Sequence, residues 1–211
     1  MKKIVCGILA GCLVLATATG CQKNASGKTP ITLNEVAHSI FYAPQYAAIE
    51  LGYFDEEGLD VTLVNGGGAD KVMTALVSGE ADYAVNFAQL TQRAGNFLVG
   101  REPEPDFQWE NLKGKKVLGG RAGGMPQMVF EYILKKNGLD PVNDLTIDQS
   151  ISFGLTAAAF TSSAADYTIE FEPFATTLEM EGSGAVVASL GTESGYVPYT
   201  AYSARKSYLK Q

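Results

Sequence analysis

The sequence predicts an α/β protein of two lobes, and three observations support this. Strand-like and helix-like segments alternate along the chain, which is typical of parallel sheets covered by helices. The order strand, helix, strand, helix, strand occurs twice. Short motifs also return, since Gly58-Leu59-Asp60 reappears as Gly138-Leu139-Asp140 and Ala81-Asp82-Tyr83 as Ala165-Asp166-Tyr167. Each copy therefore predicts one βαβαβ unit, and two units predict two lobes.

The first copy begins at Ile31. Its predicted elements are a strand at 31–37, a helix at 39–52, a strand at 61–65, a helix at 66–80 and a strand at 81–88. Pro44 suits the first turn of the first helix, and Gly52 suits its C-terminal cap. The strands are rich in residues that favour β-structure, and the second helix carries its apolar residues on one face.

The second copy begins at Lys115. Its predicted elements are a strand at 115–121, a turn and helix at 122–138, a turn and strand at 139–151, a helix at 152–164 and a strand at 165–173. Pro126 lies near the start of the first helix and Gly138 at its end, so the helix start and stop signals of the first copy are repeated. Each lobe is therefore expected to contain a parallel sheet with right-handed crossovers.

The first 21 residues predict an export signal. Lys2 and Lys3 precede an apolar run of about 16 residues, shorter than the roughly 20 that a spanning helix needs. The run ends in Ala18-Thr19-Gly20-Cys21, which resembles the lipidation box of bacterial lipoproteins. A box ending at Cys12 would leave almost no apolar region, and the alternative is an ordinary signal peptide with an incidental cysteine. We therefore expect lipidation at Cys21 and an extracytoplasmic protein anchored on the outer face of the membrane or in the periplasm.

The domain organisation follows from these patterns. The predicted segments are a signal peptide at 1–21, a tether at 22–29, lobe 1 at 30–90, an inter-lobe crossing segment at 91–113, lobe 2 at 114–195 and a return segment towards lobe 1 at 196–211. The tether is polar, and the crossing segment contains a Pro- and acid-rich loop. Two α/β lobes joined in this way predict a cleft between them, where strand ends and helix N-termini converge.

Composition excludes several functions. The chain has 211 residues and a formal net charge of −7, without a basic stripe that could bind nucleic acid. All three cysteines lie in the first 21 residues, so the remainder has no disulfide or cysteine metal site. His38 is the only histidine, and no metal-ligand spacing surrounds it. We expect no metal and no cofactor, and a structural or cleft-edge role for His38.

Four stretches carry a resemblance to a known family. They read "YAPQYAAIELGYFDEEGLDVTLV", "ALVSGEADYAV", "WENLKGKKV" and "GGMP". Together they resemble the substrate-binding lipoproteins of ABC importers for nitrate, taurine, sulfonates and thiamine-pyrimidine precursors. The resemblance covers roughly Thr29 to Gln211. It implies a two-lobed fold of the periplasmic-binding-protein type that closes on a small solute and docks on a permease.

The chain also departs from that family. Asp82 is followed at once by "YAVNFAQLTQ", without the dozen or more residues that a crossover to a parallel strand needs. The chain ends at "ARKSYLKQ", where family members continue. We interpret this as a member with an internal deletion and a truncated end, or as a fragmentary gene, so lobe 1 is expected to be incomplete.

Two glutamates are the strongest candidates for ligand binding. Glu170 and Glu172 lie two residues apart at the end of a predicted strand, so they share a face. Such strand ends are where open α/β sheets bind ligands, and a carboxylate there can accept hydrogen bonds from an N–H or amino group. The alternative is a solvated strand end or a salt bridge. No nucleophile or cofactor motif accompanies the pair, so acid–base catalysis is not predicted.

Other candidates support two kinds of ligand. Ser39, Phe41 and Tyr42 precede a helix and could hold a flat heterocycle by stacking and one hydrogen bond, although the two aromatics could equally be core residues. Glycine-rich turns containing Gly67 and Gly123 expose backbone N–H groups that favour anions, and Arg121 would strengthen this, but glycine also serves any tight turn. The glutamates and aromatics slightly favour an amino-bearing heterocycle, such as a thiamine pyrimidine, over a sulfonate, taurine or nitrate.

The leading functional hypothesis is therefore a transport receptor. It would be a lipid-anchored monomer that captures a small solute and delivers it to an ABC permease, with energy from the partner ATPase. One alternative is an enzyme similar to thiamine-pyrimidine synthases, but such relatives need a histidine where this chain has Tyr42, together with a cysteine-rich motif. The other alternative is a receptor fragment that binds no ligand.

Overall fold

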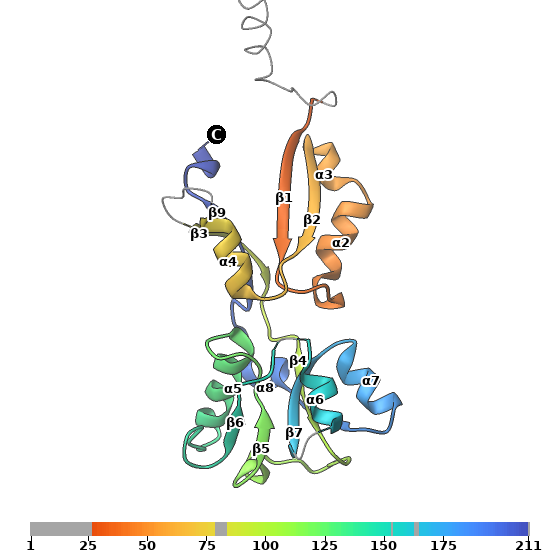
Figure 1. Cartoon of the computed structure of the whole chain (residues 1–211), viewed down its shortest axis with the longest axis vertical. Coiled ribbons are helices and arrows are strands. Elements are labelled where there is room, and N and C mark those ends of the chain that lie inside the picture. The colour runs from red at the N-terminus through yellow and green to blue at the C-terminus, as the bar shows by residue number, and fades with distance from the viewer. Residues whose placement is uncertain (1–26, 79–83, 153, 163–164, 211) are drawn as a thin grey trace, which may run out of the picture. The chain divides into compact units, whose positions relative to one another are not determined.

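The computed structural model describes residues 27–78, 84–152, 154–162 and 165–210 (Figure 1). Within these ranges the chain divides into two compact units. The first holds residues 27–33 and 46–63, and the second holds residues 34–45 and 64–210. The lobe boundaries drawn from the sequence stay a prediction. The predicted signal peptide with Cys21 lies outside the described residues.

The first unit is built on a two-stranded sheet, and the chain segment that connects the two strands forms helices. Its elements are β1 (Thr29–Glu35), α2 (Ala43–Glu50), α3 (Tyr53–Glu56) and β2 (Leu59–Asn65). The last residues of β1 and β2 and the first residues of α2 are assigned to the second unit. Gly52 separates α2 from α3 with a φ of 77°, a left-handed conformation that glycine adopts without steric cost. This agrees with the sequence, in which Gly52 is the expected C-terminal cap of the helix.

The third strand of the first copy pairs elsewhere. After α4 (Ala69–Val77), β3 (Ala84–Thr91) forms an antiparallel two-stranded sheet with β9 (Thr200–Arg205). The prediction that this strand joins the other two in one parallel sheet is therefore wrong. Local alternation of strands and helices identifies a strand but not its partner, and here the partner lies more than 100 residues away.

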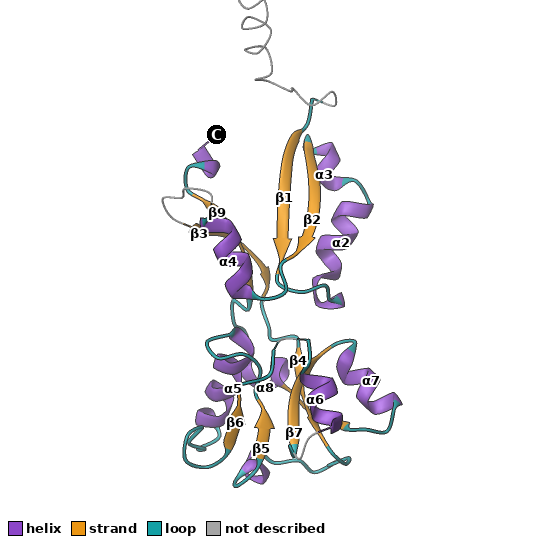
Figure 2. Cartoon of the chain, in the orientation of Figure 1, coloured by secondary structure: helices purple, strands orange, loops and turns teal. Residues whose placement is uncertain are grey.

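The second copy folds as predicted. Its elements are β5 (Lys116–Leu118), α5 (Met125–Lys136), β6 (Thr146–Asp148), α6 (Thr156–Ser162) and β7 (Tyr167–Phe171). β5 pairs in parallel with both β6 and β7, so the βαβαβ unit has its first strand in the middle (Figure 2). Gly138 ends α5 with a φ of 76°, and Pro126 lies in its first turn.

Two further strands extend this sheet. β4 (Asn96–Gly100) and β8 (Ala185–Ser189) are antiparallel to their neighbours, which gives a five-stranded sheet of order β6-β5-β7-β4-β8. β4 comes from the segment that the sequence predicts to cross between lobes. The remaining helices are α7 (Phe174–Met180), α8 (Leu190–Ser194) and short 3₁₀ helices at Ile40–Tyr42, Trp109–Leu112 and Tyr208–Lys210.

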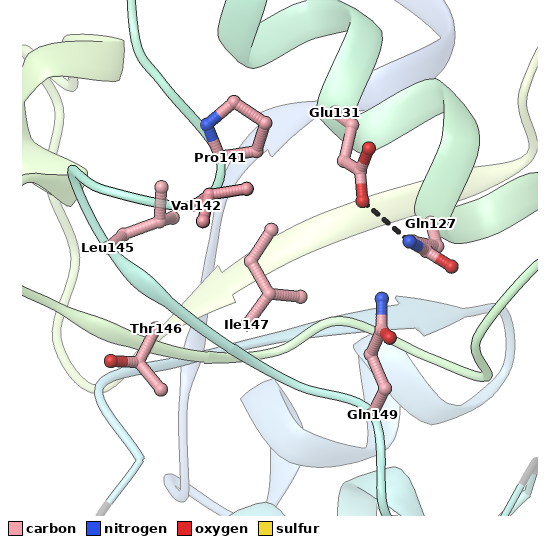
Figure 3. A pocket seen from close by; sticks show the side chains of 8 residues that line it. All are labelled: Gln127, Glu131, Pro141, Val142, Leu145, Thr146, Ile147 and Gln149. Carbon is pink, nitrogen blue, oxygen red and sulfur yellow. Dashed lines mark hydrogen bonds between the residues drawn. The ribbon is translucent and has the colours of Figure 1, made fainter.

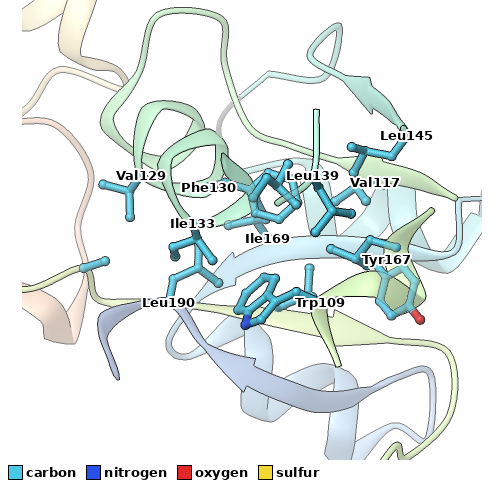
Figure 4. Close-up of a cluster of buried hydrophobic side chains, with 14 of the residues drawn as sticks. Trp109, Val117, Val129, Phe130, Ile133, Leu139, Leu145, Tyr167, Ile169 and Leu190 are labelled. Carbon is cyan, nitrogen blue, oxygen red and sulfur yellow. The ribbon is translucent and has the colours of Figure 1, made fainter. Parts of the chain in front are cut away.

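Apolar clusters cover both faces of this sheet. One cluster joins α5 and α8 to the sheet and includes Phe130, Ile169 and Trp109 (Figure 4). The other cluster joins α6 and α7 to the opposite face and includes Phe160 and Leu178. Successive residues of a strand point to opposite faces of the sheet. In a strand that is buried on both faces, neighbouring side chains therefore belong to different clusters. No helix in the described ranges is both long and apolar enough to span a membrane.

Candidate ligand-binding site

A small cavity lies beyond the carboxyl ends of β5 and β7. Its volume is about 40 Å³, and all of its lining belongs to the second unit. The lining comes from the loop at 37–39, the residue Gly120 after β5, the first turns of α5 and α6, and the segment from Ile169 to Phe174. The chain leaves β5 through α5 towards β6, and it returns from β6 through α6 to β7 on the other side of β5. The cavity therefore occupies the topological switch point, where open α/β sheets bind ligands.

Glu170 contributes a buried carboxyl group to this cavity. Only 2% of the residue is exposed. Its two carboxyl oxygens each accept a hydroxyl hydrogen bond, one from Thr168 at 2.7 Å and one from Thr156 at 3.1 Å. Burial raises the pKa of the Glu170 carboxyl from 4.5 to about 7, although the two hydroxyl bonds act in the opposite direction. The group is therefore poised to gain or lose a proton near neutral pH.

Glu172 also lines the cavity, but its carboxylate has a structural partner. The Thr176 backbone N–H and hydroxyl donate to its two oxygens at 3.1 Å and 3.0 Å, which ties it to the first turn of α7. Ser39 lines the cavity as well, and its hydroxyl donates to the Glu172 carbonyl oxygen at 3.0 Å. The same hydroxyl accepts from the Phe41 N–H at 3.3 Å. Ser39 therefore fixes the strand end that presents both glutamates.

Phe41 and Tyr42 lie in an aromatic cluster rather than in the cavity lining. The Phe41 ring centroid is 5.5 Å from that of Tyr42, 5.7 Å from that of Phe171 and 5.6 Å from that of Tyr199. Tyr42 is buried. This arrangement agrees with the alternative that the two aromatic rings pack in the protein core. Their role in stacking on a ligand stays a prediction.

The residues proposed for an anion do not line the cavity either. The Gly67 N–H donates to the Asn65 side chain at 2.9 Å, and the Gly123 N–H donates to the side-chain oxygen of Gln127. Arg121 pairs with Asp70 at 3.4 Å on a half-exposed surface. The backbone donors and the cation are therefore engaged within the protein, outside the cavity.

His38 also belongs to the cavity lining, and its structural or cleft-edge role stays a prediction. Its Nδ1 lies 2.9 Å from a carboxylate oxygen of Glu35, whose side chain is buried. The Gln45 amide donates to the other Glu35 oxygen at 3.5 Å. Sequence reasoning did not identify Thr156 or Thr168 as the partners of Glu170. The Thr-x-Glu spacing in β7 was a usable signal, since it places both side chains on one strand face.

A second depression lies between α5 and β6 at the edge of the sheet (Figure 3). Its volume is about 330 Å³, and its lining includes the hydrogen-bonded pair Gln127 and Glu131. None of the residues proposed from the sequence lines it. Within the described ranges, no group of three or more metal-ligating side chains that could hold a metal ion is found.

Comparisons with known proteins identify similar sequences and similar folds. Residues 40–97 match the family model described as "NMT1/THI5 like". The chain is 46% identical over 220 residues to YtlA of Bacillus subtilis (strain 168), a protein named as a binding protein. The alignment covers 95% of this chain and 66% of YtlA, so the chain spans just under two thirds of the length of that relative.

Solved structures share the fold at low sequence identity. The alkanesulfonate-binding protein SsuA from Xanthomonas axonopodis pv. citri, bound to MOPS, is 19% identical with a TM-score of 0.64, over 87% of this chain and 67% of SsuA. The ligand-binding component of an ABC-type import system from Staphylococcus aureus is 16% identical with a TM-score of 0.66, over 87% of this chain and 68% of that one. The chain therefore has the α/β, periplasmic-binding-protein-like fold that the resemblance implied, and it is similar in sequence to a protein named as a binding protein.

Proposed function

We propose that the chain is the solute-binding component of an ABC importer and that it captures a small solute in the cavity beyond β5 and β7. The observation that carries this proposal is the buried Glu170 carboxyl at the topological switch point of the sheet. A permease and its ATPase would be the partners. The relation to YtlA and to structures of importer binding proteins supports the proposal.

The chemistry of the cavity favours a ligand that donates hydrogen bonds. Apart from Glu170, the inner lining is mostly apolar, with Ile169, Phe171 and Phe174 among its members. The α5 residue in the lining is Pro126, which has no N–H to offer an anion. A carboxylate facing an anion in such surroundings would be costly. An amino-bearing heterocycle, such as a thiamine pyrimidine, therefore fits better than a sulfonate, taurine or nitrate, although SsuA is an alkanesulfonate-binding protein.

The size of the cavity adds a requirement. A volume of about 40 Å³ is far below the roughly 300–1,000 Å³ of typical small-molecule pockets. A six-membered ring can enter only if the lining moves. The segment at 37–39 and the turn before α6 are among the parts of the lining that belong to neither a strand nor a helix. Ligand binding is therefore proposed to widen the cavity.

The remaining parts of the proposal follow the sequence. Cys21 would carry a lipid anchor on an extracytoplasmic monomer. Ser39, Glu170 and Glu172 are the proposed site residues that line the cavity, while ligand contacts by Phe41, Tyr42, Gly67, Arg121 and Gly123 remain proposals without a place in that lining. The relatives are binding proteins, and no observation favours the synthase alternative.

The test is thermal unfolding of the purified full chain in a mild detergent. Melting would be recorded alone and with amino-pyrimidines, thiamine, riboflavin, taurine, alkyl sulfonates and nitrate. A ligand at 100 times its Kd stabilises the folded state by about 2.7 kcal/mol, which raises Tm by roughly 5–10 °C for a chain of this size. Glu170→Leu should remove the shift, whereas Glu131→Gln, outside the cavity, should retain it. A cooperative melt that no compound shifts would refute this choice of ligands, and no cooperative melt would indicate a receptor fragment.

A further inference from the structure

The hydrogen-bonding capacity of Glu170 defines a narrower class of ligand. A carboxylate has about four acceptor positions, and the hydroxyls of Thr156 and Thr168 occupy one on each oxygen. About one position per oxygen remains. When the group is protonated, one oxygen donates through its O–H and the other still accepts. The carboxyl group can therefore offer a donor and an acceptor side by side.

An amino group next to a ring nitrogen is the complement of such a carboxylic acid. The amino N–H donates to one carboxyl oxygen while the ring nitrogen accepts from the O–H of the other. We propose that the ligand is a basic heterocycle of this kind and that it shares the proton of Glu170 in a two-bond pair. This inference rests on the proposed function. Moving the proton from the carboxyl oxygen to the ring nitrogen converts the neutral pair into a carboxylate and a cation, so no charge is gained or lost overall.

The surroundings of Glu170 support a shared proton. Burial already holds the pKa of its carboxyl near neutral pH. No lysine or arginine is present among the described residues that line the cavity, so no fixed cation competes for the carboxylate. The uncharged groups around it come from α6, β4, β7 and α7: Thr156, Phe97, Thr168 and Phe174.

Two other ionisable groups share the cavity. His38 is paired with Glu35, and the Glu172 carboxylate is tied to Thr176. His38→Gln is included as a control, since it removes the only imidazole in the cavity lining and leaves Glu170 unchanged.

The test compares two isomeric probes by calorimetry on the full chain in a mild detergent. In 4-amino-2-methylpyrimidine the amino group is next to a ring nitrogen, whereas in 5-amino-2-methylpyrimidine it is not. The 4-amino isomer should bind at least 10-fold more tightly. Above pH 8 both the free carboxyl and the free probe lack the proton, so binding should take up close to one proton and the association constant should fall about 10-fold per pH unit.

Two variants connect this behaviour to Glu170. An amide also presents an adjacent donor and acceptor, so Glu170→Gln should bind the 4-amino isomer with an affinity independent of pH from 7.5 to 9.5. Thr156→Val removes a hydrogen bond to the ionised form, which should move the fall in affinity upward by about one pH unit. His38→Gln should retain the fall. Proton uptake is measured from the buffer dependence of the binding enthalpy.

Each result has one meaning. Equal binding of the two isomers, pH-independent binding to the unaltered chain, or tighter binding of ethanesulfonate than of the 4-amino isomer would overturn the shared-proton pair but leave a solute receptor in place. A cooperatively folded chain that binds none of the transport panel would overturn the proposed function as well.

Discussion

Replacing Glu170 by glutamine measures what the buried carboxyl costs the folded protein. In the unfolded chain this group ionises with a pKa of about 4.5, whereas in the folded protein its pKa is about 7. Because the folded-state pKa is the higher one, the folded state holds the proton more tightly, and stability falls as pH rises from about 4.5 to about 7. The shift is about 2.5 pKa units, and at 1.36 kcal/mol per unit it is worth about 3 kcal/mol.

We therefore expect Glu170→Gln to be more stable than the unaltered chain at pH 8 by up to about 3 kcal/mol, and similar to it at pH 4.5. Urea unfolding without ligand would measure the difference. Trp109 is the only tryptophan and is buried in the core of the same unit, so its fluorescence follows the unfolding of the part that contains Glu170.

Glu131→Gln is the matched control for this experiment. Its carboxylate lies at the surface depression between α5 and β6, away from the cavity, so its effect should be small at every pH. A difference between Glu170→Gln and the unaltered chain that stays constant from pH 4.5 to pH 8 would contradict the assignment of a raised pKa to a buried Glu170.

Three further substitutions test the packing of the second unit, each by urea unfolding followed through Trp109. Phe130→Ala should lower the free energy of unfolding by about 3–5 kcal/mol, because the ring is fully buried between α5 and the sheet; a loss below 1 kcal/mol would contradict that packing. Asn96 is fully buried, and its amide atoms find no hydrogen-bond partner among the described residues, so Asn96→Leu should stabilise the unit by about 1 kcal/mol; destabilisation would point to a buried water on the amide. Arg121→Ala breaks only the half-exposed pair with Asp70 and should change stability by less than about 1 kcal/mol without altering solute binding; a loss of binding would restore Arg121 as a site residue.

The elements that the sequence predicted well are those with local signals. The unit from β5 to β7 was predictable because Pro126 and Gly138 mark the ends of α5 and because strand-like and helix-like segments alternate along the chain. β3 and β4 are also strand-like in sequence, but their partners lie 67 or more residues away, and period alone does not specify a partner. The antiparallel additions to the sheet therefore needed the structure.

The candidate site shows the same division. Glu170 and Glu172 could be placed at a strand end from sequence, since β7 has a clear alternation and Pro173 follows it. The different environments of the two carboxylates could not be predicted from sequence. The Glu170 partner Thr156 comes from another element, and the Glu172 partner Thr176 lies beyond Pro173. Phe41 was ambiguous for a related reason, since its ring partners Phe171 and Tyr199 are distant in sequence.

The position of β4 has a consequence for how the chain acquires its structure. This strand is made early, yet both of its neighbours, β7 and β8, are made roughly 70 to 90 residues later. Contacts of such long sequence separation carry a large loop-closure cost and slow the folding reaction. Residues 96–100 therefore remain an unpaired apolar segment while the polypeptide elongates, exposed to chaperones or to unwanted association. The sheet is completed at the β4 edge only when residues 185–189 emerge and pair with β4 as its last strand.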